Sequence, residues 1–596
     1  MTINIQLQRA ISEALRTVYT IDAAPESIIL QTTKKEFEGD YTWVVFPFVK
    51  QIKKSPEAIA REVGERVVEN LQHIASFNVV KGFLNFVVAD SYWVSFVAEH
   101  HHDSRYGMAD VPSDANPIVV EYSSPNTNKP LHLGHIRNNL LGWSVSELLA
   151  ANGKKVRRVN LVNDRGIHIC KSMLAWKLYG NGETPESSGM KGDHLVGKYY
   201  VEFDKHYKEQ VNQLTDKGVP EEEAKQQAPL MVAAGQMLKQ WEEGDPEVRN
   251  LWEIMNGWVY QGFDETYRKM GVEFDKVYYE SNTYLLGKEL VQRGLDMGVL
   301  YRKEDGSVWC DLTADGLDQK LLLRRDGTSV YITQDLGTAL LRHNDFDADQ
   351  LIYVVGNEQD YHFKVLKLIL SKLGFEWADK VYHLSYGMVE LPNGKMKSRE
   401  GTVVDADDLI AEMEDDAAAM CRERGKLDDM EQAEQEHLFH ILAMGALKYF
   451  ILKVDPTKNM LFNPAESIDF NGNTGPFIQY THARIRSIVR KGDASEIDYT
   501  QITDTDAITE KEREVVKTLH EMQDVIDQAA SSYSPAMIAN YAYDLAKKFN
   551  SFYQDTPILR EGKESLRCFR VALCAMVSYT LKNTMKILGI EVPERM

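Results

Sequence analysis

"PIVVEYSSPNTNKPLHLGHIRNNLLGWSVSELLAANGKKVRRVNLV" (residues 117–162) carries the clearest folding signal in this chain. The apolar runs at 117–122 and 156–162 have the length and composition of buried strands. Between them, apolar residues recur at helical spacing until Asn152-Gly153, a pair that favours the end of a helix. Strand, helix and strand in this order predict a βαβ unit, the building block of a parallel sheet whose ligands bind at the carboxyl ends of its strands.

The composition limits the class of protein. A chain of 596 residues is too long for one hydrophobic core, so we expect about two to four domains. Hydrophobic residues make up 43% and charged residues 26%, as is typical of soluble globular proteins. The net charge of −21 argues against non-specific nucleic-acid binding by the whole surface, although it is compatible with a local basic track.

The sequence favours a cytoplasmic protein. The five cysteines are scattered, with no CxxC pair and no histidine at zinc spacing, which favours a reduced compartment. The stretch "MTINIQLQRAISEALRTVYT" reads as an amphipathic helix and lacks the basic-then-apolar order of a signal peptide. No apolar run approaches the roughly 20 residues that a membrane-spanning helix needs.

The pattern changes along the chain and predicts three domains. Residues 1–112 mix helices with alternating strands, which indicates a small α+β domain. Residues 113–410 form the parallel-sheet domain, interrupted at about 181–270 by a charged helical insertion. Residues 411–596 read almost wholly as helix.

Two histidines lie where the loop after the first strand enters the helix. His132 and His135 flank Gly134, so their imidazoles and the free backbone N–H groups lie at the positive end of that helix, which favours an anion. A zinc site would need a third ligand, and no carboxylate or cysteine occurs at useful spacing before Asp164. The plain alternative is a pair of solvated loop histidines.

A second candidate for a phosphate loop is "GDHLVGK" (192–198). It matches the Walker pattern through Lys198, but Tyr199 stands where a serine or threonine must bind magnesium. No apolar strand precedes it, so we interpret the match as a coincidence within the insertion.

A basic loop occurs much further on, at "LPNGKMKSREGTVVDADDL" (391–409). Lys395, Lys397 and Arg399 alternate in a glycine-bounded loop that follows a strand-like run. Cations in such a loop suit the charge that develops on a pyrophosphate leaving group. Alone, a loop of this kind is more often a solvated surface turn.

Together, the two loops resemble the HIGH and KMSKS signatures of class I aminoacyl-tRNA synthetases, and "EYSSPNTNKPLHLGHIRNN" resembles the arginyl-tRNA synthetases in particular. Further blocks look like that family in its usual order: "VNDRGIH", "GTSVYITQDLG", "YVVGNEQDYH", "NTGPFIQYTHARIRSI" and "LGIEVPERM". The resemblance implies an α/β fold with a Rossmann-like parallel-sheet catalytic domain, an α+β N-terminal tRNA-contacting domain and an all-α C-terminal anticodon-binding bundle.

The resemblance also implies an activity. Such an enzyme ligates L-arginine to tRNA(Arg) in two steps: arginyl-adenylate forms from ATP and arginine, and the arginyl group then passes to the terminal adenosine of tRNA. Mg²⁺ would accompany ATP as part of the substrate complex, with no metal bound by the protein. The resemblance further implies a cytoplasmic monomer with no DNA or membrane partner. It also implies that the activation of arginine requires bound tRNA.

The resemblance assigns site residues by position. Catalytic roles fall to Lys129, His132, His135 and Lys395. The ATP contacts would be His132, Gly134, His135, Lys395, Met396, Lys397 and Ser398. For arginine, Glu121 and Asn126 would hold the amino-acid end, and the residues around the guanidinium would be Glu280, Tyr331, Asp335 and Gln359. Carboxylates suit a guanidinium because the planar group donates paired, charge-assisted hydrogen bonds to them.

Two of these assignments have structural alternatives. Tyr331 could be a buried strand tyrosine with a satisfied hydroxyl. Asp335 could be the N-cap of a helix that begins after "YITQD".

The basic loop departs from the family signature. In an ungapped alignment, Ser398 stands where most class I enzymes have the second lysine of KMSKS, and Lys129 would take over its role. A gapped register keeps Lys397-Ser398 as the Lys-Ser pair and makes Lys129 less essential. We favour the ungapped register.

For tRNA, the resemblance points to Tyr480, His482, Arg484 and the terminal Met596. Aromatic and basic groups alternate here, as an unstacked RNA loop would require. Alternatively, Tyr480 belongs to the core and Arg484 is a surface cation. Two other functions compete: a different class I synthetase, and a non-catalytic tRNA-binding paralogue, against which the intact His132, His135, Lys129 and Lys395 argue.

Overall fold

The computed structural model describes residues 3–34, 36–390, 404–424, 430–492, 498–502 and 508–596. These residues form two compact units. Unit 1 comprises residues 1–106, 484–522 and 545–580, and unit 2 comprises residues 107–483, 523–544 and 581–596. Among the described residues, no helix has the combination of length and apolarity that crossing a membrane requires.

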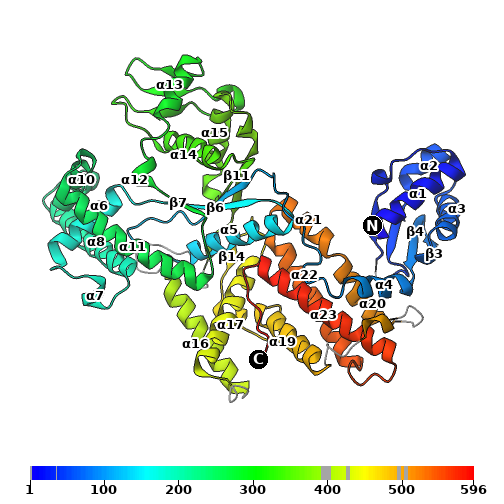
Figure 1. Cartoon of the computed structure of the whole chain (residues 1–596). Coiled ribbons are helices and arrows are strands. Elements are labelled where there is room, and N and C mark those ends of the chain that lie inside the picture. The colour runs from blue at the N-terminus through cyan, green and yellow to red at the C-terminus, as the bar shows by residue number, and fades with distance from the viewer. Residues whose placement is uncertain (1–2, 35, 391–403, 425–429, 493–497, 503–507) are drawn as a thin grey trace. The chain divides into compact units, whose positions relative to one another are not determined.

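Unit 2 is built on a five-stranded sheet (Figure 1) in which every pair of neighbours is parallel. In spatial order the strands are β12 (Val381–Tyr386), β11 (Gln350–Gly356), β5 (Ile118–Glu121), β6 (Val156–Val162) and β7 (Lys276–Tyr279). Helix α5 (Leu133–Ala151) connects the adjacent strands β5 and β6. The predicted βαβ unit is therefore confirmed.

The sheet is covered on both faces. Val119 and Leu351 belong to a buried core cluster shared with the helices that follow β7 and β11, and their strand neighbours Val120 and Ile352 are also buried. Successive strand side chains point to opposite faces, so burial of both sets requires layers on both sides. Helix α5 is buried nearly all round, and Gly142 lets it approach Tyr122, whose ring atoms would lie 2.2 Å from an added Cβ.

A second group of elements in unit 2 carries part of the site. Its helices are α12 (Glu280–Thr283), α13 (Lys288–Asp296), α14 (Tyr331–Phe346) and α15 (Asp360–Lys372), and its antiparallel strands are β8 (Leu300–Arg302), β9 (Val308–Cys310) and β10 (Lys320–Leu323). The sequence of residues 320–337 is typical of strands, but only the first four of these residues form one. Helix α14 begins at Tyr331.

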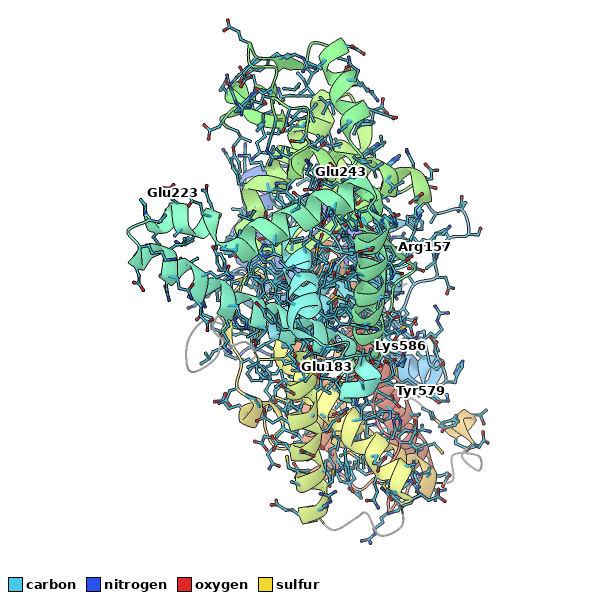
Figure 2. All side chains as sticks on the ribbon, turned by 90° about the vertical axis from the view of Figure 1, so that its left-hand side faces the viewer. Arg157, Glu183, Glu223, Glu243, Tyr579 and Lys586 are labelled. Carbon is cyan, nitrogen blue, oxygen red and sulfur yellow. The ribbon has the colours of Figure 1, made fainter. Side chains whose placement is uncertain are left out.

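The insertion of unit 2 is helical. Its elements are α6 (Ile167–Tyr179), α7 (Pro185–Ser188), α8 (Gly192–Asp216), α9 (Glu221–Gln227), α10 (Pro229–Glu243) and α11 (Pro246–Met270). Figure 2 shows Glu223 and Glu243 on the outer helices α9 and α10, where both are exposed. The "GDHLVGK" stretch lies inside α8, so it is helix and not a phosphate loop.

Unit 1 contains a four-stranded antiparallel sheet, which confirms the predicted α+β domain. In spatial order its strands are β1 (Leu30–Thr32), β2 (Tyr41–Val44), β4 (Phe83–Val88) and β3 (Ile74–Val80), with helices α1 (Ile3–Tyr19), α2 (Phe46–Ile52), α3 (Pro56–Asn70) and α4 (Asp90–His100). The apolar face of α1 is buried at Ile3, Leu7, Ile11 and Leu15. Gly64 of α3 leaves room for the ring of Phe77, 2.6 Å from an added Cβ.

The rest of the chain is almost entirely helical, as predicted. The helices are α16 (Ala406–Arg424), α17 (Gln432–Leu452), α18 (Pro464–Ser467), α19 (Gly475–Lys491), α20 (Glu510–His520), α21 (Met522–Ser532), α22 (Pro535–Asp555) and α23 (Glu564–Ile587). Two short parallel strands, β13 (Val389–Glu390) and β14 (Met460–Leu461), pair with each other in unit 2.

Candidate active site

His132 and His135 cap the N-terminus of α5 with their side chains. The backbone N–H of Gly134 donates to His132 Nδ1 at 3.1 Å, and the backbone N–H of His132 donates to His135 Nδ1 at 3.2 Å. The two ring centroids lie 3.9 Å apart. Because each Nδ1 accepts a hydrogen bond, each neutral ring carries its proton on Nε2 and can donate it.

The electrostatics of this end of α5 favour an anionic ligand. Burial lowers the pKa of His132 to about 4 and that of His135 well below its ordinary value, so both rings are neutral at pH 7. Burial also lowers the pKa of Lys129. Among the described residues, no carboxylate forms an ion pair with Lys129. Its charge adds to the lowering of the pKa values of His132 and His135, which places the lysine close to the positive end of the helix.

The chain that follows the basic loop is attached to the same place. The backbone N–H of Leu133 donates to Val404 O at 3.1 Å, and that of Ala406 donates to Leu131 O at 3.0 Å, so His132 and Asp405 face each other in an antiparallel bridge. The predicted ATP-binding residues Lys395, Met396, Lys397 and Ser398 lie outside the described residues, and the register of their loop stays a prediction.

Glu121, at the carboxyl end of β5, pairs with a cation that the sequence analysis missed. Its carboxylate forms an ion pair with Arg342 of α14 and accepts a hydrogen bond from Ser124 Oγ at 3.1 Å. Arg342 is only 2% exposed, and its guanidinium lies over the rings of Tyr278 and Tyr353, 5.5 and 5.3 Å from their centroids. Burial raises the pKa of Glu121, and Arg342 opposes that effect.

One signal in the sequence could have identified Arg342. It follows Asp335 by seven residues in α14, which places both on one face of the helix. Asp335 Oδ2 lies 2.6 Å from His362 Nε2, and the helix starts four residues earlier with Val330 as its N-cap. The capping interpretation of Asp335 is therefore wrong. Tyr331 is 79% exposed at the start of the helix, so the buried-strand interpretation is also wrong.

Glu280 begins α12 directly after β7. Burial raises its pKa to about 7, with Arg165 opposing and the carboxylates of Asp164 and Asp335 adding to the effect. Asp164, the acidic residue of "VNDRGIH", positions this turn: it accepts hydrogen bonds from Ser281 N at 2.8 Å, Ser281 Oγ at 2.7 Å and Tyr260 at 2.8 Å. Asp164 is not among the site residues predicted from the sequence, although its place just after β6 was a signal.

The remaining predicted pocket residues share the same edge of the sheet. Gln359 is exposed in the 3₁₀ turn that follows β11, and Asn126 is exposed in the loop after β5, where it bridges Asn163 at the end of β6. Glu121 thus ends one of four neighbouring parallel strands, and Asp164, Glu280 and Gln359 follow the other three. The carboxyl edge of such a sheet is where α/β proteins bind their ligands.

Two of the predicted tRNA-binding residues of unit 2 lie on α19. Tyr480 is half-buried, and its ring meets Phe470 edge-on at 6.2 Å. His482 is fully buried, and its Nδ1 lies 3.0 Å from Pro593 O, so its ring contacts the C-terminal tail and not the surface. Next to the half-buried Met596, Arg595 forms a forked ion pair with Glu434. In unit 1, Arg484 donates to Asn550 Oδ1 and lies 5.5 Å from the ring centroid of Tyr553.

One group of side chains in the described residues has metal-ligand spacing. It consists of Asp193, His194 and Asp407, whose ligand atoms lie within 4.8 Å of one another. The ammonium of Lys191 already lies 3.1 Å from Asp193 Oδ2 and 2.7 Å from Asp407 Oδ2. His132 and His135 are not part of any such group of three among these residues.

Comparison with known proteins agrees with this geometry. A family model described as the catalytic domain of tRNA synthetases class I (R) matches residues 101–464, a DALR anticodon binding domain matches 478–596, and an arginyl tRNA synthetase N terminal domain matches 5–88. The chain belongs to the arginyl-tRNA synthetase family. The family resemblance of the sequence is thereby confirmed, and a class I synthetase of another family is excluded.

Curated members of the arginyl-tRNA synthetase family align with the chain from end to end. The arginine–tRNA ligase of Bacteroides fragilis is 58% identical over 597 residues and that of Porphyromonas gingivalis strain W83 is 55% identical over 597 residues, each with 100% of both chains covered. The arginyl-tRNA synthetase structures of Thermus thermophilus and Plasmodium falciparum are 24% and 18% identical and cover both chains fully, each with a TM-score of 0.77. These two structures confirm the fold.

Proposed function

We propose that this chain ligates L-arginine to tRNA(Arg) for protein synthesis. In the first step a carboxylate oxygen of arginine attacks the α-phosphorus of ATP, the bond from that phosphorus to the bridging oxygen breaks, and pyrophosphate leaves. In the second step the terminal adenosine of tRNA takes the arginyl group and AMP is released. Membership of the arginyl-tRNA synthetase family supports both the enzyme class and the substrates ATP, arginine and tRNA.

The observation that carries the proposal is the charge arrangement along one edge of the sheet. Carboxylates from three elements, Glu121, Glu280 and Asp335, interact electrostatically there. Helix α5 follows β5, the strand that ends at Glu121. The N-terminus of this helix presents two neutral imidazoles and Lys129. A ligand pair with a cationic guanidinium at one end and phosphates at the other matches this arrangement.

For the ATP half, the chain supplies donors and cations. His132 and His135 would donate their Nε2–H groups to the phosphates, Gly134 would let the nucleotide lie close to the backbone, and Lys129 would neutralise developing charge. Donors held in place before the reaction stabilise a transition state most effectively. From the basic loop, Lys395, Met396, Lys397 and Ser398 would add contacts. Mg²⁺ would arrive with ATP, as part of the substrate.

For the arginine half, Asp335 and Glu280 would bind the guanidinium, with Tyr331 and Gln359 beside them. Glu121 and Asn126 would hold the amino-acid end. Arg342 acts as a positioning residue, because its ion pair opposes the rise in the pKa of Glu121 that burial causes and fixes the direction of the carboxylate. Loss of one hydrogen bond from a polar pocket discriminates strongly, which explains how the enzyme could reject other amino acids without editing.

The two flanking regions would bind tRNA. Residues 1–112 form the proposed tRNA-contacting domain, residues 113–410 the catalytic domain and residues 411–596 the anticodon-binding domain. Tyr480, Arg484 and Met596 would contact the RNA, and His482 would contribute by holding the tail on which Met596 lies. We also propose that the protein is a monomer and works in the cytoplasm. Light scattering of the purified chain can check the monomeric state against its mass of 68.0 kDa.

The deciding experiment is charging of total tRNA with each of the twenty amino acids, with and without ATP, followed by ATP–pyrophosphate exchange. We expect ATP-dependent charging with arginine alone, and exchange that appears only when tRNA is added. Charging with another amino acid would contradict the pocket assignment. Tight tRNA binding without any charging would instead support the non-catalytic alternative.

A further inference from the structure

Three segments of unit 2 meet at the side chain of Lys191, just before α8. Its ammonium donates to Asp193 Oδ2 at 3.1 Å, to Thr266 Oγ1 of α11 at 2.6 Å and to Asp407 Oδ2 of α16 at 2.7 Å. Asp193 is fully buried, and Lys191 and Asp407 have side chains only 16% and 13% exposed. The cluster therefore lies largely out of water, where removal of one charge leaves its partner uncompensated.

His194 also contacts the segment that contains Asp405 and Asp407. Its Nε2 lies 3.0 Å from Asp407 Oδ2 and 3.6 Å from Asp405 Oδ1. Asp405 also accepts hydrogen bonds from the backbone N–H groups of Asp407 at 2.8 Å and Asp408 at 3.3 Å, and so caps α16. The first turn of α16 is thus held by side chains of the insertion as well as by its own cap.

A glycine on α11 makes room for the buried carboxylate of this cluster. Gly262 of α11 faces Asp193, and a Cβ at that position would lie 2.4 Å from Asp193 Oδ1. A side chain there would displace the carboxylate that holds Lys191. Since the lysine ammonium already fills the space between Asp193 and Asp407, the group is an ion-pair cluster and not a cation site.

This cluster continues directly into the ATP end of the site. Asp405 stands opposite His132 in the antiparallel bridge, through the hydrogen bonds from Leu133 N to Val404 O and from Ala406 N to Leu131 O. The backbone that positions His132 is therefore bonded to the segment that Lys191 and His194 hold. A displacement of α16 would pass to the phosphate-binding histidine through two backbone hydrogen bonds.

We propose that Lys191 and His194 are positioning residues for the ATP step, which hold the Asp405–Asp407 turn so that His132 stays in place for the phosphates. This inference rests on the proposed role of His132. It predicts an effect on ATP and not on arginine, because the carboxylates proposed for arginine lie on other elements.

The charges around His194 add a pH dependence. Its neighbours are Asp405, which caps α16, Asp407 of α16, Asp193 of α8 and Lys191. Lys269 of α11 lies 3.8 Å from Asp407. The hydrogen bond to Asp407, followed by Asp405 and Asp193, raises the pKa of His194 above its ordinary 6.5 against the effect of burial. A raised histidine pKa means that the ion pair is complete at low pH and is lost as the pH rises through that value.

The test uses ATP–pyrophosphate exchange with tRNA present, on the full-length chain. Lys191→Met and His194→Gln should lower kcat/KM for ATP about tenfold or more while KM for arginine stays within about twofold, since small displacements of positioned groups cost this much. Wild type should lose ATP efficiency as the pH rises through the pKa of His194, and His194→Gln should lack that loss. The matched control is Lys198→Met on α8, which removes an exposed ion pair with Glu183 and a cation–π contact with Tyr199, both outside the cluster.

A double variant separates positioning from stability. Lys191→Met with Asp407→Asn removes two opposite charges together, so thermal stability should recover relative to Lys191→Met alone, while the ATP defect should remain. Recovery of ATP efficiency in the double variant, or equal losses for ATP and arginine in the single variants, would overturn the inference. Absence of charging by wild type would instead refute the proposed function.

Discussion

Glu121 and Arg342 form a buried ion pair across the strand and the helix that carry the proposed arginine pocket. Glu121 is 7% exposed and Arg342 is 2% exposed. A buried ion pair seldom adds much net stability to a protein, because the cost of desolvating both charges offsets most of their mutual attraction. The pair is better explained by its effect on the site: it fixes one carboxylate at the end of β5 and opposes the rise in its pKa that burial causes.

We expect Arg342→Met to be costly in two ways. The unpaired Glu121 should destabilise the fold by about 3–5 kcal/mol in chemical denaturation. In kinetics, KM for arginine should rise more than KM for ATP. The control is Arg157→Met (Arg157 is labelled in Figure 2), which breaks a partly exposed pair with Asp275 and should cost about 0–1 kcal/mol. Adding Glu121→Gln to Arg342→Met should restore much of the stability but not the arginine binding.

Glu280 should make arginine binding pH-dependent near neutrality. Because burial raises its pKa to about 7, it is largely protonated at pH 6 and ionised at pH 8. The guanidinium requires the ionised form, so KM for arginine should fall as the pH rises across this range. In the free enzyme the sign is opposite: Glu280 costs stability as the pH rises from its ordinary pKa of 4.5 to about 7. Glu280→Gln should abolish both trends, and an unchanged KM profile in that variant would refute the role.

Asp335→Asn should weaken arginine binding more than ATP binding. The variant keeps the shape of the side chain beside His362 but removes the charge that we propose faces the guanidinium. We expect KM for arginine to rise about tenfold or more and KM for ATP to change little, since charge-assisted hydrogen bonds contribute more than neutral ones. Asp349→Asn, at an exposed ion pair with Lys380, is the matched control. Equal losses for both substrates would show that Asp335 only stabilises α14.

Lys129→Ala should stop activation without unfolding the protein. Lys129 has no carboxylate partner among the described residues, so its loss leaves no buried charge uncompensated. Exchange and charging should fall by about 10²-fold or more if its ammonium stabilises the transition state, as loss of one such group does elsewhere. The melting temperature should match that of Lys154→Ala, an exposed lysine beyond the end of α5. An unchanged rate would favour the gapped register of the basic loop.

Local pattern was sufficient for much of this protein. The βαβ unit at 117–162, the helical insertion and the helical C-terminal region follow from residue spacing over one or two turns, and the structure has them. Where pattern failed, a local ambiguity was responsible. The run before Asp335 reads as a strand because Val330, Tyr331 and Ile332 favour strands, but the turn at Gly327 lets the helix begin at Tyr331.

Motifs named the groups of the site but not their state. The sequence contains His132, His135, Glu121, Glu280 and Asp335 at positions typical of the arginyl-tRNA synthetases, and family comparison confirms that membership. The sequence alone does not determine the protonation states of these side chains. Neutral histidines and a Glu280 with a pKa near 7 arise from burial, which depends on segments that arrive from elsewhere in the chain.

The pairings were visible only in three dimensions. Arg342 meets Glu121, and Lys191 meets Asp407, across long stretches of sequence. Periodicity is a property of neighbouring residues, so the chain alone specifies which faces are apolar and which loops carry histidine, lysine or carboxylate. Which distant charges become partners depends on how those faces pack, because Coulomb energy and desolvation both follow from distance and burial in the folded molecule.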